Sequence, residues 1–374
     1  MMRDRLPLLL LAGLAAGCAD NSAAPPAPTE ALSRHGTTLT APTLTPQVSG
    51  TTNGLIAVSP LNSRVVWAAG RAGTYTRTTD GGATWRAGVV PGAEGLQFRD
   101  VEAISAREAY LLSIGSGTDS RIYHTSDAGA TWQLQFQNPI ADAFYDCFAF
   151  WNRRSAVAMS DAVNGRFPIL RTTNGSTWTD IGDKVVPALP GEAGFASSGT
   201  CIATHGRRHA WFVTGGASTA RVIATTDGGE HWRAFDTPLR GSPSAGIFSV
   251  AFRDRQHGII AGGDLDPSAP PFQNIATSRD GGASWTLGGL APVGTVFGIA
   301  YLGHGGPGVV ATGPGGTAWS ADEGAHWTAI DGLTGYWAVA FANPHAGWVV
   351  GVNGTITKVS FAGGDDDDDR HDDD

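Results

Sequence analysis

One eight-residue pattern recurs along the chain and limits its possible folds more than any other feature. The pattern, Ser/Thr-x-Asp-x-Gly-x-x-Trp, first occurs as TTDGGATW at residues 78–85. Further copies occupy residues 125–132, 225–232, 278–285 and 320–327, and a shortened copy, TTNGSTW, occupies residues 172–178. The period of about forty to fifty-five residues is in the range of propeller blades. The repeat therefore predicts a β-propeller.

The chemistry of the repeat is that of a tight turn between two antiparallel strands. Its Ser/Thr hydroxyl and its Asp carboxylate accept hydrogen bonds from backbone amides, and its glycines allow positive φ where the chain reverses. The pattern resembles the Asp-box (BNR repeat) of sialidases and related propellers, in which the box lies on the outer rim, away from the site. The resemblance implies a structural role for the box residues Asp80, Asp127, Asn174, Asp227, Asp280 and Asp322.

The N-terminal segment has the layout of an export signal. Two arginines within residues 1–5 precede an apolar stretch at residues 6–16, and LAAGC closes the segment at residues 14–18. This ending resembles a bacterial lipobox, so we expect a lipoprotein signal peptide at residues 1–18 and lipidation of Cys18. The alternative is an ordinary cleaved signal peptide. Ala19 favours the outer membrane under the sorting rule that this resemblance implies, so we expect a cell-envelope protein that meets the membrane only through its lipid anchor.

Two polar segments flank the body of the chain. Residues 19–47 are rich in Ala, Pro, Thr and Ser and predict a flexible linker. Residues 362–374 carry eight aspartates and one arginine and predict a disordered acidic tail. The tail accounts for −7 of the formal net charge of −9, so the rest of the chain is close to neutral. It has no basic field to hold a nucleic acid.

The body, residues 48–361, has the pattern of an all-β domain. Short alternating apolar runs separate Gly, Asp and Asn turns, and long amphipathic helical periods are absent from the sequence. The seventh repeat has no box and no fourth strand, but residues 38–49 alternate and can supply that strand, which would leave no open edge. We therefore predict a seven-bladed propeller closed by an N-terminal strand, with inner strands near Leu55, Val101, Cys147, Cys201, Val250, Ile299 and Val339.

The repeats also resemble a more specific family. An apolar strand, the pattern Gly-Trp-x-Val-Gly at residues 347–351, Gly-Thr-Ile at residues 354–356 and the boxes together look like the photosystem II assembly/stability factor family and related bacterial lipoproteins. The resemblance covers about residues 48–361. It implies a non-catalytic assembly factor that binds a protein partner, in the photosynthetic members through an arginine-rich face. In this chain the arginines are scattered, so the resemblance names no particular partner.

The starts of the inner strands carry the residues of the predicted binding site. Inner strands line the central channel of a propeller, and aligning them places aspartates on one side of its mouth and aromatic side chains on the other. Such a rim suits a sugar, an aromatic or cationic group, or a peptide terminus. The alternative is that the aromatics plug the channel and the aspartates cap strand ends. The predicted ligand-binding residues are Arg99, Asp100, Tyr145, Asp146, Phe248, Phe297, Tyr336 and Trp337.

The predicted function is the binding of a protein partner without catalysis. The alternative is a sialidase-like or other glycan-active hydrolase that uses the channel mouth. Sialidase chemistry needs three converging arginines, a Tyr/Glu pair and an acidic residue, and those enzymes carry a Phe/Tyr-Arg-Ile-Pro motif ahead of the first box. No such motif precedes Asp80. No catalytic residue, cofactor or metal site is predicted, and a glycan is the alternative ligand.

Two cysteines occupy the same inner-strand position of neighbouring repeats. An oxidising periplasm allows Cys147 and Cys201 to form a disulfide. Equivalent positions on adjacent blades point the same way round the axis, so their side chains need not face each other. We therefore interpret them as two buried, unpaired thiols.

Overall fold

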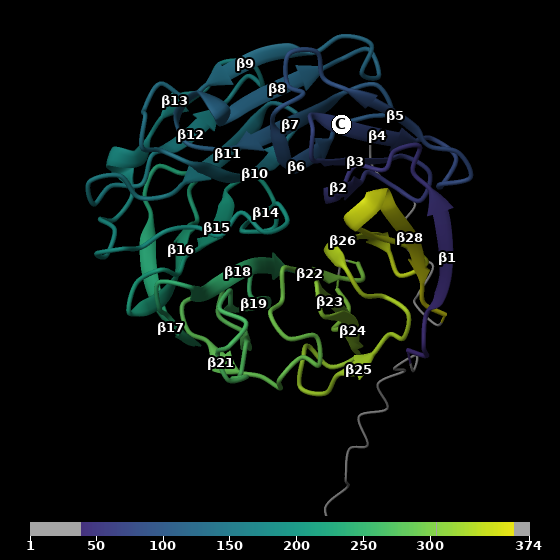
Figure 1. The fold of residues 1–374 in the computed structure, drawn as a ribbon. Coiled ribbons are helices and arrows are strands. Elements are labelled where there is room, and N and C mark those ends of the chain that lie inside the picture. Colours follow the sequence, from purple (N-terminus) through teal and green to yellow (C-terminus); the bar gives the residue numbers. More distant parts are fainter. Residues whose placement is uncertain (1–38, 304, 363–374) are drawn as a thin grey trace, which may run out of the picture. The chain divides into compact units, whose positions relative to one another are not determined.

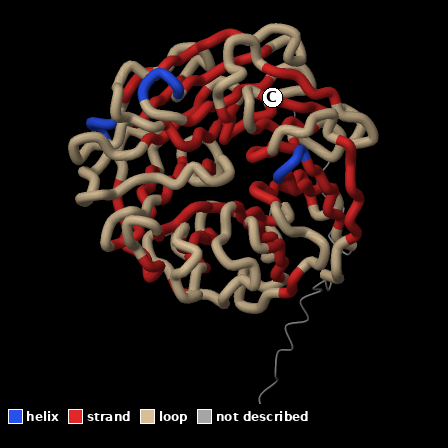
Figure 2. The backbone as a smooth tube through the Cα atoms, viewed as in Figure 1, coloured by secondary structure: helices blue, strands red, loops and turns tan. Residues whose placement is uncertain are grey.

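The computed structural model describes residues 39–303 and 305–362. These residues form seven antiparallel sheets of four strands each, arranged as blades around a central axis (Figure 1). Figure 2 shows strands and loops throughout, with three short 3₁₀ turns: η1 (Gly117–Asp119), η2 (Gly182–Lys184) and η3 (Val352–Gly354). The all-β class and the seven blades are confirmed. No helix among the described residues has the length and apolar character needed to cross a membrane.

Six blades each contain four strands that are consecutive in the chain, ordered from the axis outward. Blades one to three contain β2 (Leu55–Pro60), β3 (Val66–Gly70), β4 (Thr74–Thr78) and β5 (Arg86–Val89); β6 (Gln97–Ala103), β7 (Ala109–Ile114), β8 (Arg121–Thr125) and β9 (Gln133–Gln137); and β10 (Tyr145–Asn152), β11 (Ser155–Ser160), β12 (Ile169–Thr172) and β13 (Thr179–Asp180). Blades four to six contain β14 (Ile202–His205), β15 (His209–Val213), β16 (Thr219–Thr225) and β17 (Arg233–Arg240); β18 (Ala245–Phe252), β19 (Gly258–Asp264), β20 (Ile275–Ser278) and β21 (Thr286–Leu287); and β22 (Gly298–Tyr301), β23 (Val309–Gly313), β24 (Gly316–Ser320) and β25 (Thr328–Ala329).

The seventh blade joins the two ends of the domain. It contains β26 (Tyr336–Asn343), β27 (Ala346–Gly351), β28 (Thr355–Ser360) and, as its outermost strand, β1 (Thr43–Val48) (Figure 1). Strand β1 runs antiparallel to β28, so that Thr43 pairs with Ser360 and Val48 with Thr355. Closure by an N-terminal strand is thus confirmed, and the folded body begins at Thr43 rather than at residue 48. The predicted signal peptide with Cys18, the first part of the linker and nearly all of the acidic tail lie outside the described residues.

The box turns are held by a repeated hydrogen-bond network. In blade one, the Thr78 hydroxyl donates to Asp80 Oδ1 at 2.7 Å and accepts the Gly82 N–H at 2.9 Å. Asp80 in turn accepts the Thr84 N–H at 2.9 Å and the Thr84 hydroxyl at 2.6 Å. The contacts recur around Asp127, Asp227, Asp280 and Asp322, while Asn174 collects the Ser176 and Thr177 amides on one oxygen. The box residues therefore fix the turns between the third and fourth strands.

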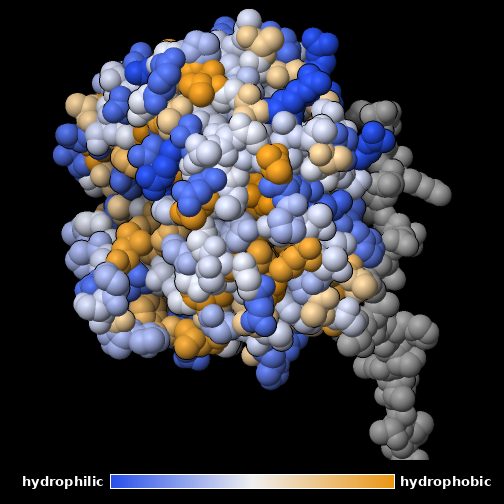
Figure 3. Space-filling view, turned by 45° about the vertical axis from the view of Figure 1, so that its right-hand side comes forward, coloured by the Kyte–Doolittle hydropathy of each residue, from blue (hydrophilic) through white to orange (hydrophobic). Residues whose placement is uncertain are grey.

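The core consists of the interfaces between blades. Trp67, Trp211 and Trp348 are fully buried in second strands. The indoles of Trp67 and Trp211 bond to the next blade, whereas that of Trp348 bonds to Gln47 of β1 in its own blade. The Trp67 indole donates to Ser105 O at 3.1 Å and the Trp211 indole to Gly281 O at 2.7 Å. On the outside, apolar residues form only small separate groups on the face drawn in Figure 3. The sheets thus bury their apolar faces against one another and form a rigid frame for the central channel.

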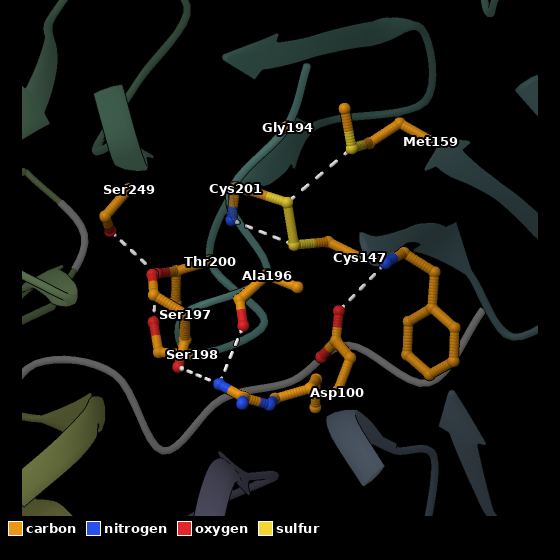
Figure 4. Close-up of a disulfide and its surroundings, with 12 residues drawn as sticks. Asp100, Cys147, Met159, Gly194, Ala196, Ser197, Ser198, Thr200, Cys201 and Ser249 are labelled. Atoms are coloured by element: carbon orange, nitrogen blue, oxygen red, sulfur yellow. Dashed lines mark hydrogen bonds between the residues drawn. A yellow bond between two sulfur atoms is a disulfide. The ribbon is translucent and has the colours of Figure 1, made fainter. Parts of the chain in front are cut away.

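The interpretation of the two cysteines as unpaired thiols is wrong. Cys147 in β10 and Cys201, directly ahead of β14, form a disulfide with a Cα–Cα distance of 6.0 Å (Figure 4). Both occupy the same position of neighbouring blades, as expected. The chain enters Cys201 from a loop rather than from an extended strand, so its side chain is not held to the orientation of its equivalents. The bond joins blades three and four next to the axis.

Candidate functional site at the channel mouth

Most of the inner strands carry a β-bulge close to their first residues. The pairing of inner and second strands shifts at Ile56, Arg99, Asp146, Phe248 and Trp337. A bulge adds one residue and redirects a side chain, and here it presents one residue of each of these blades at the mouth. The alignment predicted from sequence was off by one in blade two, because Arg99, rather than Asp100, occupies the position of Asp146 and Trp337.

Aromatic rings form a continuous arc on one side of the mouth. The ring centres of Phe248 and Phe297 are 6.1 Å apart, and those of Phe297 and Trp337 are 5.0 Å apart. Phe195 extends the arc from a loop, with its ring 4.3 Å from Phe248. The predicted grouping of Phe248, Phe297 and Trp337 is therefore present in the structure. Phe195 was missed because it lies outside the repeated strands.

The loop that ends in Cys201 lies across the mouth; we call residues 192–200 the plug. Its Ser197 and Ser198 hydroxyls donate to Phe297 O at 3.0 and 2.6 Å, across the channel in blade six. On the blade-two side, Arg99 Nη1 donates to Ala196 O at 2.8 Å. At its base, buried Glu192 forms a salt bridge with Arg221 of β16. The plug therefore closes this end of the channel with backbone as well as aromatic rings.

Asp100 supports the strands beneath the plug. Its carboxylate accepts the backbone N–H groups of Val101 and Phe148, both at 2.8 Å. Burial raises the pKa of Asp100 well above its ordinary value. Gly199 of the plug, with a φ of +77°, packs so closely that an added Cβ would lie 2.6 Å from Asp100 Oδ1. Asp100 is thus placed as the strand-capping alternative describes.

Asp146 faces a second carboxyl group, Asp161, beneath the plug. Asp161 accepts the Gly194 N–H at 2.7 Å, and Asp146 Oδ2 is buried with no hydrogen-bond partner among the described residues. Burial, followed by the Asp161 charge, raises the pKa of Asp146 well above its ordinary value. Burial also raises the pKa of Asp161 to about 6. Asp146 is buried and Asp161 half-buried, and the hydrogen bond to Asp161 holds the plug from below.

Tyr145 and Tyr336 are both buried, the first between blades two and three and the second within blade seven. The Tyr145 ring packs edge-on against Phe136, with ring centres 5.4 Å apart, and the Tyr336 hydroxyl lies 2.7 Å from the Thr357 hydroxyl. Among the predicted mouth residues, the half-buried ones are Arg99 and Trp337. The surface that a ligand can reach at this end is therefore centred on these two side chains.

Two guanidinium groups lie against the Trp337 indole. The Cζ atom of Arg99 is 5.0 Å from the ring centre, and that of exposed Arg71 is 5.9 Å from it. Within the described part of the chain, neither arginine forms an ion pair. Burial, and then the charge of Arg71, lowers the pKa of Arg99 to about 10, so Arg99 is protonated at neutral pH. We call Arg71, Arg99 and Trp337 the cationic rim; Arg71 was missed because it follows a second strand.

Comparisons with known proteins support the fold. The sequence matches no protein-family model and no curated protein. A solved structure of YCF48 bound to D1 peptide is 16% identical, covers 86% of this chain and 97% of its own, and gives a TM-score of 0.62. YCF48 from Cyanidioschyzon merolae is 15% identical over 85% of this chain and 98% of that one, with a TM-score of 0.58. The WD40 repeats of RRP9 are 12% identical over 87% and 100%, with a TM-score of 0.59. At these identities the likeness shows the propeller fold alone.

Proposed function

We propose that this chain is a non-catalytic propeller that binds a partner protein, and that the cationic rim takes a carboxylate of that partner. The observation that carries the proposal is the pair of guanidinium groups of Arg71 and Arg99 against Trp337, neither of which forms an ion pair among the described residues. Guanidinium groups form strong, bidentate hydrogen bonds with carboxylates. An anionic ligand would also offset the burial and the repulsion from Arg71 that together lower the pKa of Arg99.

A peptide is a fitting ligand for the shape of this surface. The plug fills the mouth behind the rim, so an extended segment would lie across the rim while the indole packs against a neighbouring side chain. A propeller of the same fold has been solved with a bound peptide, YCF48 with D1 peptide. We further propose that the protein is exported and anchored through Cys18 at the cell envelope, where the disulfide between Cys147 and Cys201 would persist.

The test is a binding assay with a panel of N-acetylated peptides that end in a free carboxylate, each paired with its C-terminal amide. Calorimetry reports binding. We expect the carboxylate forms to bind more tightly, and the Arg71→Ala/Arg99→Ala variant to lose that preference. Arg86→Ala, which removes an exposed arginine of β5, is the matched control. Equal binding of acids and amides by the native protein would overturn the proposal.

The glycan-active alternative remains a prediction with its own test. It requires an ionisable nucleophile and an acid at an accessible surface, and it is tested by incubating the protein with sialosides and a glycan array. Turnover that survives removal of the cationic rim would favour a hydrolase elsewhere on the propeller.

A further inference from the structure

A second site lies inside the channel, on the other side of the plug. A cavity of about 380 Å³ extends from Ser198 and Gly199 to residues at the ends of the inner strands, among them Pro60, Arg253 and Ala342. Its volume lies in the range of about 300–1,000 Å³ that small-molecule sites occupy. It opens toward the face opposite the cationic rim, so a ligand there would not compete with one at the rim.

Glu102 lines this cavity with a carboxylate that has no partner among the described residues. Glu102 of β6 is half-buried and lines the cavity. It forms no hydrogen bond or ion pair with any residue in the described ranges. Burial alone raises its pKa to about 7, so no neighbouring cation stabilises its charge. A side chain in this state has its full capacity to accept hydrogen bonds available to a ligand.

The strand register shows that Glu102 is not needed for the fold. The position of Glu102 in its blade can be defined by strand pairing. The box residue Thr125 pairs with Ala109 of the second strand, and the next residue, Tyr110, pairs with Glu102 of the inner strand. The same register defines one residue in each of the other blades. All of them are small, half-buried and line the cavity: Ser59, Ala149, Ala203, Ala251, Ala300 and Ala340. Six blades pack with a small residue where the second blade carries a carboxylate, so the glutamate has no packing role to explain it.

The other ionisable groups that line the cavity are already satisfied. Asp100 accepts two backbone N–H groups. Arg253 donates from Nε to Glu323 Oε1 at 2.6 Å and also lies 3.5 Å from Asp254. Tyr301 donates its hydroxyl to Glu323 at 3.4 Å. Glu102 is therefore the unmatched charge of the cavity.

We propose that the channel cavity binds a primary ammonium group on an aliphatic chain, held by the Glu102 carboxylate and admitted from the face where the inner strands end. The alanine methyl groups around the ring give the methylene chain an apolar wall, and the ammonium satisfies the carboxylate by charge-assisted hydrogen bonds. A bare metal ion is a poorer match, because no group of three His, Cys, Asp or Glu side chains gathers within the described residues. The source of the ammonium is a free amine or a lysine side chain of a partner.

The probe is n-pentylamine, titrated by calorimetry at pH 8, with pentan-1-ol as the neutral control. We expect the native protein to bind the amine, and Glu102→Gln and Glu102→Ala to bind it at least about tenfold more weakly. Arg71→Ala, which weakens only the cationic rim, should bind it unchanged, so failure of this site and failure of the proposed function are distinguishable. Nα-acetyl-lysine-N-methylamide identifies the source: binding equal to that of pentylamine indicates a lysine side chain, and weaker binding indicates a free amine.

A second measurement does not depend on variants. The pKa of Glu102, followed by carbon NMR of its carboxylate, should fall when pentylamine saturates the protein, because the ammonium stabilises the ionised form. Equal binding of amine and alcohol, an unchanged Glu102 pKa, or undiminished binding by Glu102→Gln would overturn the proposal.

Discussion

The Trp85 indole N–H donates to Gln47 Oε1 at 3.1 Å and so joins the first blade to the last. Gln47 also donates from Nε2 to Gly81 O at 3.2 Å and accepts the indole N–H of Trp348 at 3.1 Å. Within the ring, Gln135 makes the first two contacts with Trp178 and Gly175. Gln47 therefore joins blades seven and one in the same way as Gln135 joins blades two and three, and it binds the Trp348 indole in addition.

Gln47→Ala should therefore destabilise the protein more than Gln135→Ala. It leaves two buried indole N–H groups without a partner, and Gln135→Ala leaves one. We expect Gln47→Ala to lower the free energy of unfolding by about 1–3 kcal/mol, since an unsatisfied buried donor costs that much. Denaturant titration of the two variants measures the difference. Equal losses would show that the closure is no more sensitive than an internal interface.

Protonation of the box aspartates should weaken the protein in acid. Hydrogen bonds from the Thr131 hydroxyl and amide lower the pKa of Asp127 to about 2, below its ordinary 3.8. Its stabilising effect is present above pH 4 and is lost as the pH falls toward 2. Asp127→Asn should lower the melting temperature at pH 7 and differ less from the native protein at pH 2. Exposed Asp142→Asn is the control; a constant difference across this range would contradict the assignment.

Removal of the disulfide should destabilise the two blades that it joins. The bond links positions 54 residues apart, and closing a loop of that size stabilises a fold by about 2–4 kcal/mol. Cys147→Ala/Cys201→Ala should unfold at a lower denaturant concentration, and a reducing agent should shift the native protein but not the variant. Peptide mapping without reduction should recover the two cysteines in one linked fragment. Separate fragments would show that the bond does not form.

Glu102 should make stability fall as the pH rises. Its folded pKa of about 7 exceeds the ordinary 4.5, so the folded state holds a proton that the unfolded state releases between these values, and unfolding becomes easier across that window. Glu102→Ala removes this cost. We expect the variant to be more stable than the native protein by about 1–3 kcal/mol at pH 8 and equal to it at pH 4. A pH-independent difference would contradict burial of the carboxylate.

The fold was predictable because its information repeats. The six boxes mark the blades, and the alternating stretch ahead of the first blade identified β1. The residues at the channel mouth were harder to predict, because they depend on features that do not repeat from blade to blade. A bulge shifts Arg99 into the place assigned to Asp100, and the plug carrying Phe195 has no counterpart in other blades. The same break in the repeat turns Cys201 toward Cys147.

The comparison of equivalent positions is more informative than any single strand. Glu102 differs from its equivalents, because the strand register places a small residue at the same position of each of the six other blades. The register depends on bulges, which periodicity does not reveal. Structure was therefore needed to find the channel carboxylate, although every residue of the ring was present in the repeats.

The closure of the ring by β1 also determines how the domain responds to force. A pull on the chain ahead of Thr43 acts first on the pairs from Thr43–Ser360 to Val48–Thr355, and then on the contacts of Gln47. Peeling this strand exposes the edge of β28 and removes the Gln47 contacts between blade seven and blade one. Strand β1 is therefore the part of the ring that should detach first under tension. Blades three and four, in contrast, are held together by the covalent bond between Cys147 and Cys201.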